Sequence, residues 1–183
     1  MKQNKPKMSS VVSVCGLFAA LSVVIMLLAH IGVLTYAVPA IAGALLVIIY
    51  LELGVKNAFT VYLTVSVLSF LICEKEAALC YIFFFGYYPI LKAYIEKIGK
   101  KALQWLIKIA VFTVSFAIVM VLCVFIFGIP IDEMGYGVWY FAGLAVGLEV
   151  MFVVYDIALT RVITLYLVKY RESFRKLMKL NKK

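Results

Sequence analysis

Residues 138–170 read VWYFAGLAVGLEVMFVVYDIALTRVITLYLVKY, a long apolar run that contains Glu149, Asp156 and Arg161. An apolar helix of about twenty residues crosses a bilayer, and a polar group left unpaired in the hydrocarbon costs several kcal/mol. Each of these charged side chains therefore needs a partner or a function, and the rest of the chain is placed around this run.

The composition places the chain among membrane proteins. It has 183 residues, of which 66% are hydrophobic, and a mean hydropathy of +1.09. A soluble domain of this length cannot hide so much apolar surface from water. The formal net charge is +9, but the basic residues gather at the ends of apolar runs. That placement fits contact with anionic lipid headgroups, and we expect no nucleic-acid partner.

Six apolar segments follow one another along the chain, at residues 11–29, 41–53, 58–73, 77–95, 103–127 and 138–168. They predict an all-α membrane protein with six transmembrane helices in one compact bundle, and the short connections leave residues 1–183 as a single domain. The third segment contains several Ser and Thr hydroxyls, which bond within a helix or across to a neighbour, so we expect it to lie buried in the bundle.

The distribution of Lys and Arg predicts the orientation, because cytoplasmic loops near the spans carry the excess of these residues. With the N-terminus inside, only Lys75 of the eighteen Lys and Arg residues falls outside. The tails 1–10 and 169–183 are then both cytoplasmic, and the basic C-terminal tail fits a helix on the anionic inner leaflet.

Five ionisable residues are expected near the inner membrane boundary when each span is built as a helix rising about 1.5 Å per residue. They come from the second, fourth, fifth and sixth segments: Glu52, Lys92, Lys108, Asp156 and Arg161. One interpretation is a structural layer of ion pairs with snorkelling lysines. The other is a contact surface, or a switch, for a cytoplasmic partner.

Glu149 falls near the midplane of the sixth segment, where no Lys or Arg reaches it in this layout. It is either protonated, hydrogen-bonded to hydroxyls such as those of the third segment, or lining a polar cavity. Intramembrane acids are candidates for function, so a functional and a purely structural role both stay open.

Four aromatic residues are expected at the outer ends of the helices: Tyr36, Tyr136, Trp139 and Tyr140. They are typical of interfacial anchors, and together with His30 they also fit the mouth of an outward-facing pocket that binds substrate with Glu149. Two pairs of small residues, Gly16 with Ala20 and Gly143 with Gly147, allow close helix packing. They serve either within the subunit or in docking onto another membrane protein.

The sequence lacks the motifs of the common enzyme classes. It has no P-loop, HExxH or GxSxG motif and no cluster of metal ligands, and His30 is its one histidine. We therefore expect no enzymatic activity, no catalytic residue, no metal and no cofactor.

The layout resembles the substrate-binding S components of energy-coupling factor (ECF) vitamin transporters. The likeness rests on the basic N-terminal tail followed by GLFAALSVV at residues 16–24, and on Pro39 and Gly43 at the start of the second segment. FFFGYYPILK, residues 83–92, is similar to a group of uncharacterised small membrane proteins of Gram-positive bacteria. The resemblance implies six spans in a bacterial cell membrane with both termini inside, and a substrate pocket near the outer face. It also implies docking through Gly16 and Ala20 onto a transmembrane coupling subunit that two ATPases drive.

Two functions follow as expectations. The first is a subunit that binds an unknown vitamin-like small molecule for an ATP-driven uptake transporter and has no ATPase activity of its own. The alternative is a non-transporting scaffold or assembly subunit that recruits a cytoplasmic partner or lipid. A small proton-coupled carrier or channel built around Glu149 is a third possibility. An outward cavity favours the first function, and a filled bundle with a charged cytoplasmic surface favours the second.

Overall fold

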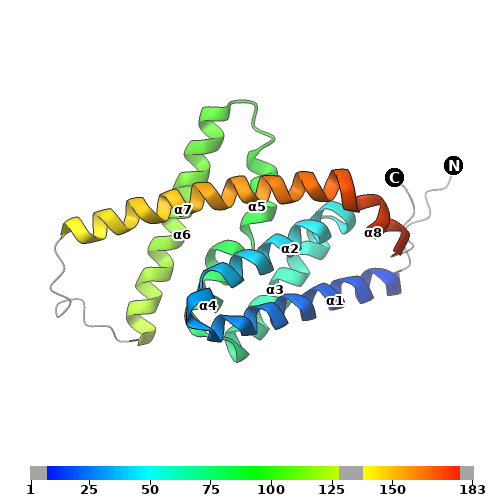
Figure 1. Ribbon diagram of the computed structural model, residues 1–183, viewed down its shortest axis with the longest axis horizontal. Coiled ribbons are helices and arrows are strands. Elements are labelled where there is room, and N and C mark those ends of the chain that lie inside the picture. The colour runs from blue at the N-terminus through cyan, green and yellow to red at the C-terminus, as the bar shows by residue number, and fades with distance from the viewer. Residues whose placement is uncertain (1–7, 128–137, 178–183) are drawn as a thin grey trace.

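The computed structural model describes residues 8–127 and 138–177, and every regular element in these ranges is helical. The longer helices in Figure 1 are α1 (Met8–Leu27), α2 (Ala37–Leu53), α3 (Val55–Ile72), α4 (Lys75–Cys80), α5 (Tyr88–Ile95), α6 (Lys101–Phe127), α7 (Val138–Leu165) and α8 (Arg171–Leu177). Shorter turns are the 3₁₀ segments η1 (Leu28–His30) and η2 (Gly32–Leu34) and the π-helices η3 (Tyr81–Phe85) and η5 (Tyr166–Tyr170).

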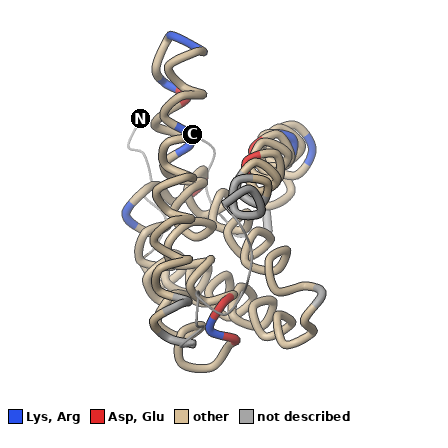
Figure 2. Tube along the Cα trace, turned by 90° about the vertical axis from the view of Figure 1, so that its left-hand side faces the viewer, with Lys and Arg blue, Asp and Glu red and all other residues tan. Residues whose placement is uncertain are grey.

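Five helical segments of the described chain are long and apolar enough to cross a membrane: Met8–His30, Val55–Ile72, Lys75–Ile95, Lys101–Leu122 and Val146–Phe174. The remaining apolar helix, α2, is shorter, with 17 residues. Figure 2 shows Lys, Arg, Asp and Glu at a few places on a tube that is otherwise uncharged. Many large apolar side chains on the helix exteriors are exposed, as lipid-facing side chains are in membrane proteins.

The helices are arranged so that the start of α1 and the C-terminal α8 lie at the same end of the molecule, on the right of Figure 1. In that view α6 crosses α7 steeply, and the two helices are in contact. Helices α2 and α3 are joined by one residue, Gly54, whose φ of 86° lies in the left-handed region that favours glycine. This residue reverses the chain without a loop.

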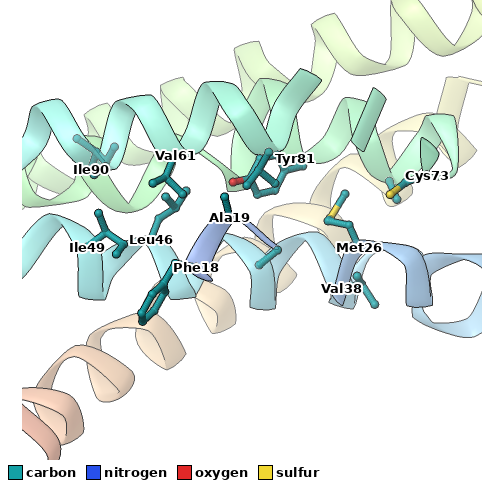
Figure 3. Close-up of a cluster of buried hydrophobic side chains, with 14 of the residues drawn as sticks. Phe18, Ala19, Met26, Val38, Leu46, Ile49, Val61, Cys73, Tyr81 and Ile90 are labelled. Carbon is teal, nitrogen blue, oxygen red and sulfur yellow. The ribbon is translucent and has the colours of Figure 1, made fainter. Parts of the chain in front are cut away.

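Helix α2 lies at the centre of the bundle and contacts α1, α3, η3, α5 and α7. Val38, Ala42, Leu46 and Ile49 recur every three or four residues, so they lie on one face of the helix. Figure 3 shows this face in the larger buried cluster, together with residues of α1, α3, η3 and α5. Val47 lies in a second cluster with Phe84, Tyr88, Phe112, Phe152 and Leu159. Helix α2 thus joins an α1–α3 half to an α5–α7 half.

Two glycines allow backbones to approach closely where α2 and α3 meet η3. A Cβ added at Gly43 would clash with the Phe85 carbonyl oxygen, and one at Gly86 would lie 2.6 Å from the Tyr62 ring. The Tyr62 hydroxyl donates a hydrogen bond of 2.8 Å to the Ile82 carbonyl of η3. The π-helix therefore packs directly against its neighbours and holds its aromatic side chains in place.

The most buried span is the fourth, and the expectation that the third lies buried is wrong. In the most apolar 18-residue window of Lys75–Ile95, 56% of the residues are buried, whereas in that of α3 the share is 28%. Thr60 and Thr64 of α3 are exposed and donate hydrogen bonds to carbonyls of their own helix. Ser66 and Ser69 of the same helix are buried, so the hydroxyls of α3 divide between its exposed and its buried face.

Candidate functional site

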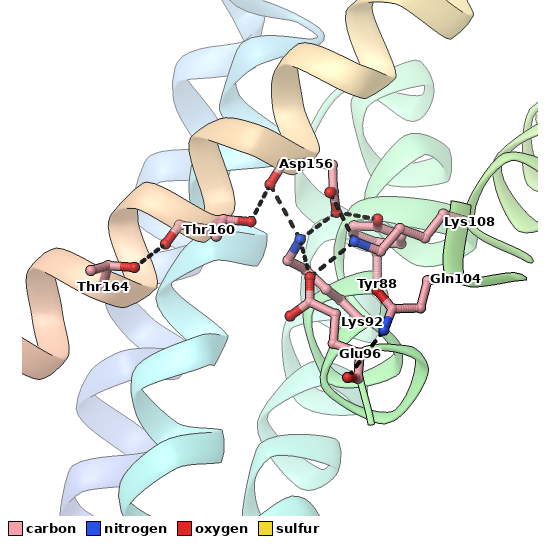
Figure 4. Close-up of polar contacts among 8 residues, drawn as sticks. All are labelled: Tyr88, Lys92, Glu96, Gln104, Lys108, Asp156, Thr160 and Thr164. Atoms are coloured by element: carbon pink, nitrogen blue, oxygen red, sulfur yellow. Dashed lines mark hydrogen bonds and ion pairs between the residues drawn. The ribbon is translucent and has the colours of Figure 1, made fainter. Parts of the chain in front are cut away.

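A buried network of charges lies where α5, α6 and α7 meet (Figure 4). Its centre is the Asp156 carboxylate on α7. One oxygen, Oδ1, accepts hydrogen bonds from Lys92 Nζ at 2.5 Å and from Tyr88 Oη at 2.6 Å. The other, Oδ2, accepts one from Lys108 Nζ at 2.9 Å. The carboxylate thus joins α7 to both neighbouring helices.

Glu96, directly after α5, closes the network from the other side. Its Oε1 lies 2.8 Å from Lys92 Nζ and 2.9 Å from Lys108 Nζ. Lys92 Nζ also donates to the Asp156 backbone carbonyl at 3.3 Å, so all three of its hydrogens have acceptors. Two ammonium groups therefore lie between two carboxylates, and the four charges balance.

The charge balance explains how these groups tolerate burial. The Lys92 and Asp156 side chains are 1% and 5% exposed, and an isolated ion so deeply buried would be strongly disfavoured. Glu96 lies outside the spans and is more open. Burial alone would raise the pKa of Glu96, but the hydrogen bonds and positive charges of Lys92 and Lys108 outweigh burial and lower its pKa below the ordinary value.

Sequence reasoning missed Tyr88 and Glu96, although a signal for them exists. Tyr88, Lys92 and Glu96 recur every four residues, and such residues lie on one face of a helix. Gln104, four residues before Lys108, donates hydrogen bonds to the Glu96 and Ile98 carbonyls and ties the α5–α6 connection down. Helical spacing applied to Lys92 would have found both missing members.

The predicted inner layer is brought together only in part. Lys92, Lys108 and Asp156 meet in the network described above. Glu52, at the end of α2, instead pairs with Arg171 Nε of α8 at 2.9 Å. Arg161 is exposed and does not join the network, because it lies on a different side of α7 from Asp156.

A cavity of about 490 Å³ lies next to the network, between the start of α2, η3, α6 and α7. Aromatic and aliphatic side chains dominate its described lining, which consists of Tyr36, Ala37, Ala40, Cys80, Phe84, Phe85, Phe112, Phe116, Val119, Leu148, Met151, Phe152, Val154 and Tyr155. This volume falls within the range of about 300–1,000 Å³ that is common for small-molecule sites. The arrangement can therefore hold an apolar molecule of moderate size.

Tyr88 connects the cavity to the charge network. Its ring lies 4.9 Å from the ring of Phe84 and 5.4 Å from that of Phe152, both of which line the cavity. The hydroxyl of the same residue donates to Asp156. The aromatic inner end of the cavity and the ion network thus form one continuous packed unit.

Tyr36 is the predicted mouth residue whose side chain is described at the cavity. Its hydroxyl lies 3.5 Å from Glu76 Oε2, and the neighbouring Thr35 donates to Glu74 Oε2 at 3.1 Å. His30 bonds to the Leu27 carbonyl of its own helix end. The predicted Tyr136 lies outside the described residues, as do the side chains of Trp139 and Tyr140.

Glu149 contacts α6, not the third segment, and it is not among the residues that line the cavity. Its Oε1 lies 2.6 Å from Thr113 Oγ1, which also lies 3.0 Å from the Ile109 carbonyl oxygen. Thr113 Oγ1 is the donor in both contacts, so its one hydrogen is shared between the Glu149 carboxyl and the Ile109 carbonyl. The buried Oε2 has no partner among the described residues.

Exchanging Glu149 for glutamine provides a test, since the amide keeps an oxygen that accepts the hydrogen bond from Thr113. We expect Glu149→Gln to change the free energy of unfolding by less than about 0.5 kcal/mol, and Glu149→Ala to lower it by about 1 kcal/mol. Thermal unfolding of the purified protein in detergent measures both. An equal loss of unfolding free energy in the two variants would contradict the hydrogen bond. If Glu149→Gln also leaves ligand binding unchanged, the role of Glu149 is structural.

The two pairs of small residues do not pack against the described part of the subunit. A Cβ added at Gly16, Gly143 or Gly147 would meet no atom within 4 Å, and Ala20 is exposed. The close approaches inside the bundle use Gly43 and Gly86 instead. The small-residue faces of α1 and α7 are therefore left on the exterior of the described chain.

Comparison with protein-family models, with curated proteins and with solved structures finds no match to this chain. The described residues also contain no group of three or more His, Cys, Asp or Glu placed to hold a metal ion. The cavity and the network beside it are therefore the features of the described chain that bear on function.

Proposed function

We propose that this chain is a membrane subunit that binds a small molecule in the aromatic cavity and acts with separate ATP-driven partners, as its resemblance to ECF S components implies. The observation that carries the proposal is the cavity of about 490 Å³, which four separate parts of the chain line. A site built this way binds through shape and apolar contact. Its described lining has no group arranged for catalysis, so the proposed role is binding without chemistry.

In this proposal the chain crosses a bacterial cell membrane six times with both termini inside. Helix α2 is the sixth span, and its 17 residues are close to the shortest length that crosses the hydrocarbon. The side that bears the start of α1 and α8 is cytoplasmic, in agreement with the excess of Lys and Arg. Tyr36 follows the far end of α1, so the cavity lies in the outer half of the bundle.

The buried network favours this function over the scaffold. A scaffold that recruits a cytoplasmic partner through the inner charges needs those charges on its surface. Lys92, Lys108 and Asp156 are instead buried and bonded to one another. Their geometry holds α5, α6 and α7 together beneath the cavity, as expected of a framework that supports a binding site.

The exterior of α1 is the proposed contact with the coupling subunit. Gly16 and Ala20 are exposed there, and a Cβ at Gly16 would meet no atom of the described chain within 4 Å. Small residues allow another helix to approach closely in a membrane. Membrane lipid covers the other apolar faces.

A pair of tryptophan substitutions on α7 tests the binding function. Met151 lines the cavity and is 67% exposed, so Met151→Trp fills the cavity without disturbing the core. Val150 is 59% exposed and does not line the cavity, which makes Val150→Trp the matched control. We expect a small molecule to copurify with the wild type and with Val150→Trp from the native membrane. The amount bound to Met151→Trp should be lower by about tenfold or more. Mass spectrometry of the denatured samples measures it.

The same preparations test the partners. Recovery of a transmembrane coupling subunit and ATPases with the wild type supports the proposed role. If no such partner copurifies and no retained molecule depends on Met151, the proposed function is wrong. Recovery of a cytoplasmic partner alone, with no bound molecule, would favour the scaffold.

A further inference from the structure

We propose that the molecule bound in the cavity is neutral and planar, with an aromatic ring system. This inference rests on the proposed function, because it names the class of ligand for the same cavity. Two features of the described lining carry it: its lack of charge and the geometry of its rings.

The lack of charge in the described lining disfavours an ionic ligand. None of the described lining residues is Lys, Arg, Asp or Glu. The nearest acids in sequence are already engaged, Asp156 by two lysines and Tyr88, and Glu149 by Thr113. An unpaired charge transferred from water into such surroundings is strongly disfavoured. A neutral ligand is the one that these side chains accommodate.

The rings of the lining favour a flat aromatic guest. Phe112 stacks on Phe152, with centroids 4.7 Å apart and planes at 13°, and lies nearly parallel to Phe116 at 6.2 Å and 17°. Phe84 meets Phe112 edge-on at 77°. Aromatic pairs prefer offset stacked or edge-to-face arrangements, and the lining presents rings in both orientations. A planar ring system continues this packing, whereas a saturated ring of the same size does not.

Tyr155 adds a further ring to this lining. Its ring packs edge-on against Phe85, with the ring centroids 5.0 Å apart.

Three probes of similar size separate these features: 2-acetylnaphthalene, its anionic analogue 2-naphthoate and its saturated analogue 2-acetyldecalin. Binding to the full-length protein in lipid nanodiscs is measured by equilibrium dialysis against empty nanodiscs, which removes partitioning into lipid. We expect 2-acetylnaphthalene to bind to the wild type and to Val150→Trp. Its affinity for Met151→Trp should be lower by about tenfold or more. We expect 2-acetyldecalin to bind about two- to tenfold more weakly, and 2-naphthoate more weakly still.

The outcomes distinguish a wrong ligand class from a wrong function. If 2-naphthoate or 2-acetyldecalin binds as tightly as 2-acetylnaphthalene or more tightly, and Met151→Trp abolishes that binding, the proposed ligand class is wrong but the site is supported. The same holds if the molecule retained from the native membrane depends on Met151 but is charged or purely aliphatic. Absence of any ligand sensitive to Met151→Trp overturns the proposed function as well.

Discussion

Replacing Asp156 with asparagine is expected to lower the free energy of unfolding by about 3–5 kcal/mol. The substitution keeps the size of the side chain but removes the negative charge that faces both Lys92 and Lys108. These ammonium groups are then left with Glu96 as their one shared carboxylate in the network. The main cause of the loss is a buried lysine charge that no carboxylate neutralises. Unfolding of the purified protein, followed by circular dichroism during denaturant titration in mixed micelles, measures the loss.

Arg161→Gln is the matched control for this substitution. It removes a charge from the same helix at an exposed position that does not join the network. We therefore expect the free energy of unfolding to change by no more than about 0.5 kcal/mol. The double variant Asp156→Leu with Lys108→Met removes one charge of each sign, and it should recover most of the stability that Asp156→Asn loses. A loss for Asp156→Asn no larger than that for Arg161→Gln would show that the network contributes nothing to stability.

Gly43→Ala is expected to be the most damaging change of a single methyl group, with a loss of about 1–3 kcal/mol or more. The added carbon would meet the backbone carbonyl of Phe85, which cannot rotate away as a side chain does. The clash would move η3, which carries Phe84 and Phe85 of the cavity lining. We therefore expect weaker retention of the bound molecule as well as lower stability, measured by unfolding and by mass spectrometry of the purified variant.

Gly16→Ala and Gly147→Ala provide the controls, because a Cβ at either position has open space around it. Alanine is the better helix former by up to about 1 kcal/mol, so these variants should be neutral or slightly more stable. If Gly43→Ala behaves like them, the close approach of α2 to η3 is not essential to the fold.

The membrane class, the helical elements and part of the network were predictable from the sequence. Apolar runs long enough to span a bilayer are visible directly, and depth along a helix follows from its rise per residue. Lys92, Lys108 and Asp156 fell at one depth for that reason, and the structure brings them together. Tyr88 and Glu96 were within reach too, since they lie on the helical stripe of Lys92.

The partners of Glu52 and Glu149 were not predictable in the same way. Glu52 pairs with Arg171, which is 119 positions further along the chain, because α8 folds back towards the end of α2. Glu149 contacts Thr113 because α7 rests on α6 at that height. Each of these contacts depends on which helices become neighbours. The sequence does not show this, because a span is apolar on nearly every side.

The apolar runs and the charges placed within them already specify a helical membrane protein, because desolvation of backbone and charge acts on each segment by itself. The cavity depends on the tertiary arrangement. Its aromatic lining comes from η3, α6 and α7, and a hollow forms between them because Gly43 admits η3 against α2 while α6 crosses α7 steeply (Figure 1). Packing of side chains across three helices depends on their relative positions, which no single segment encodes.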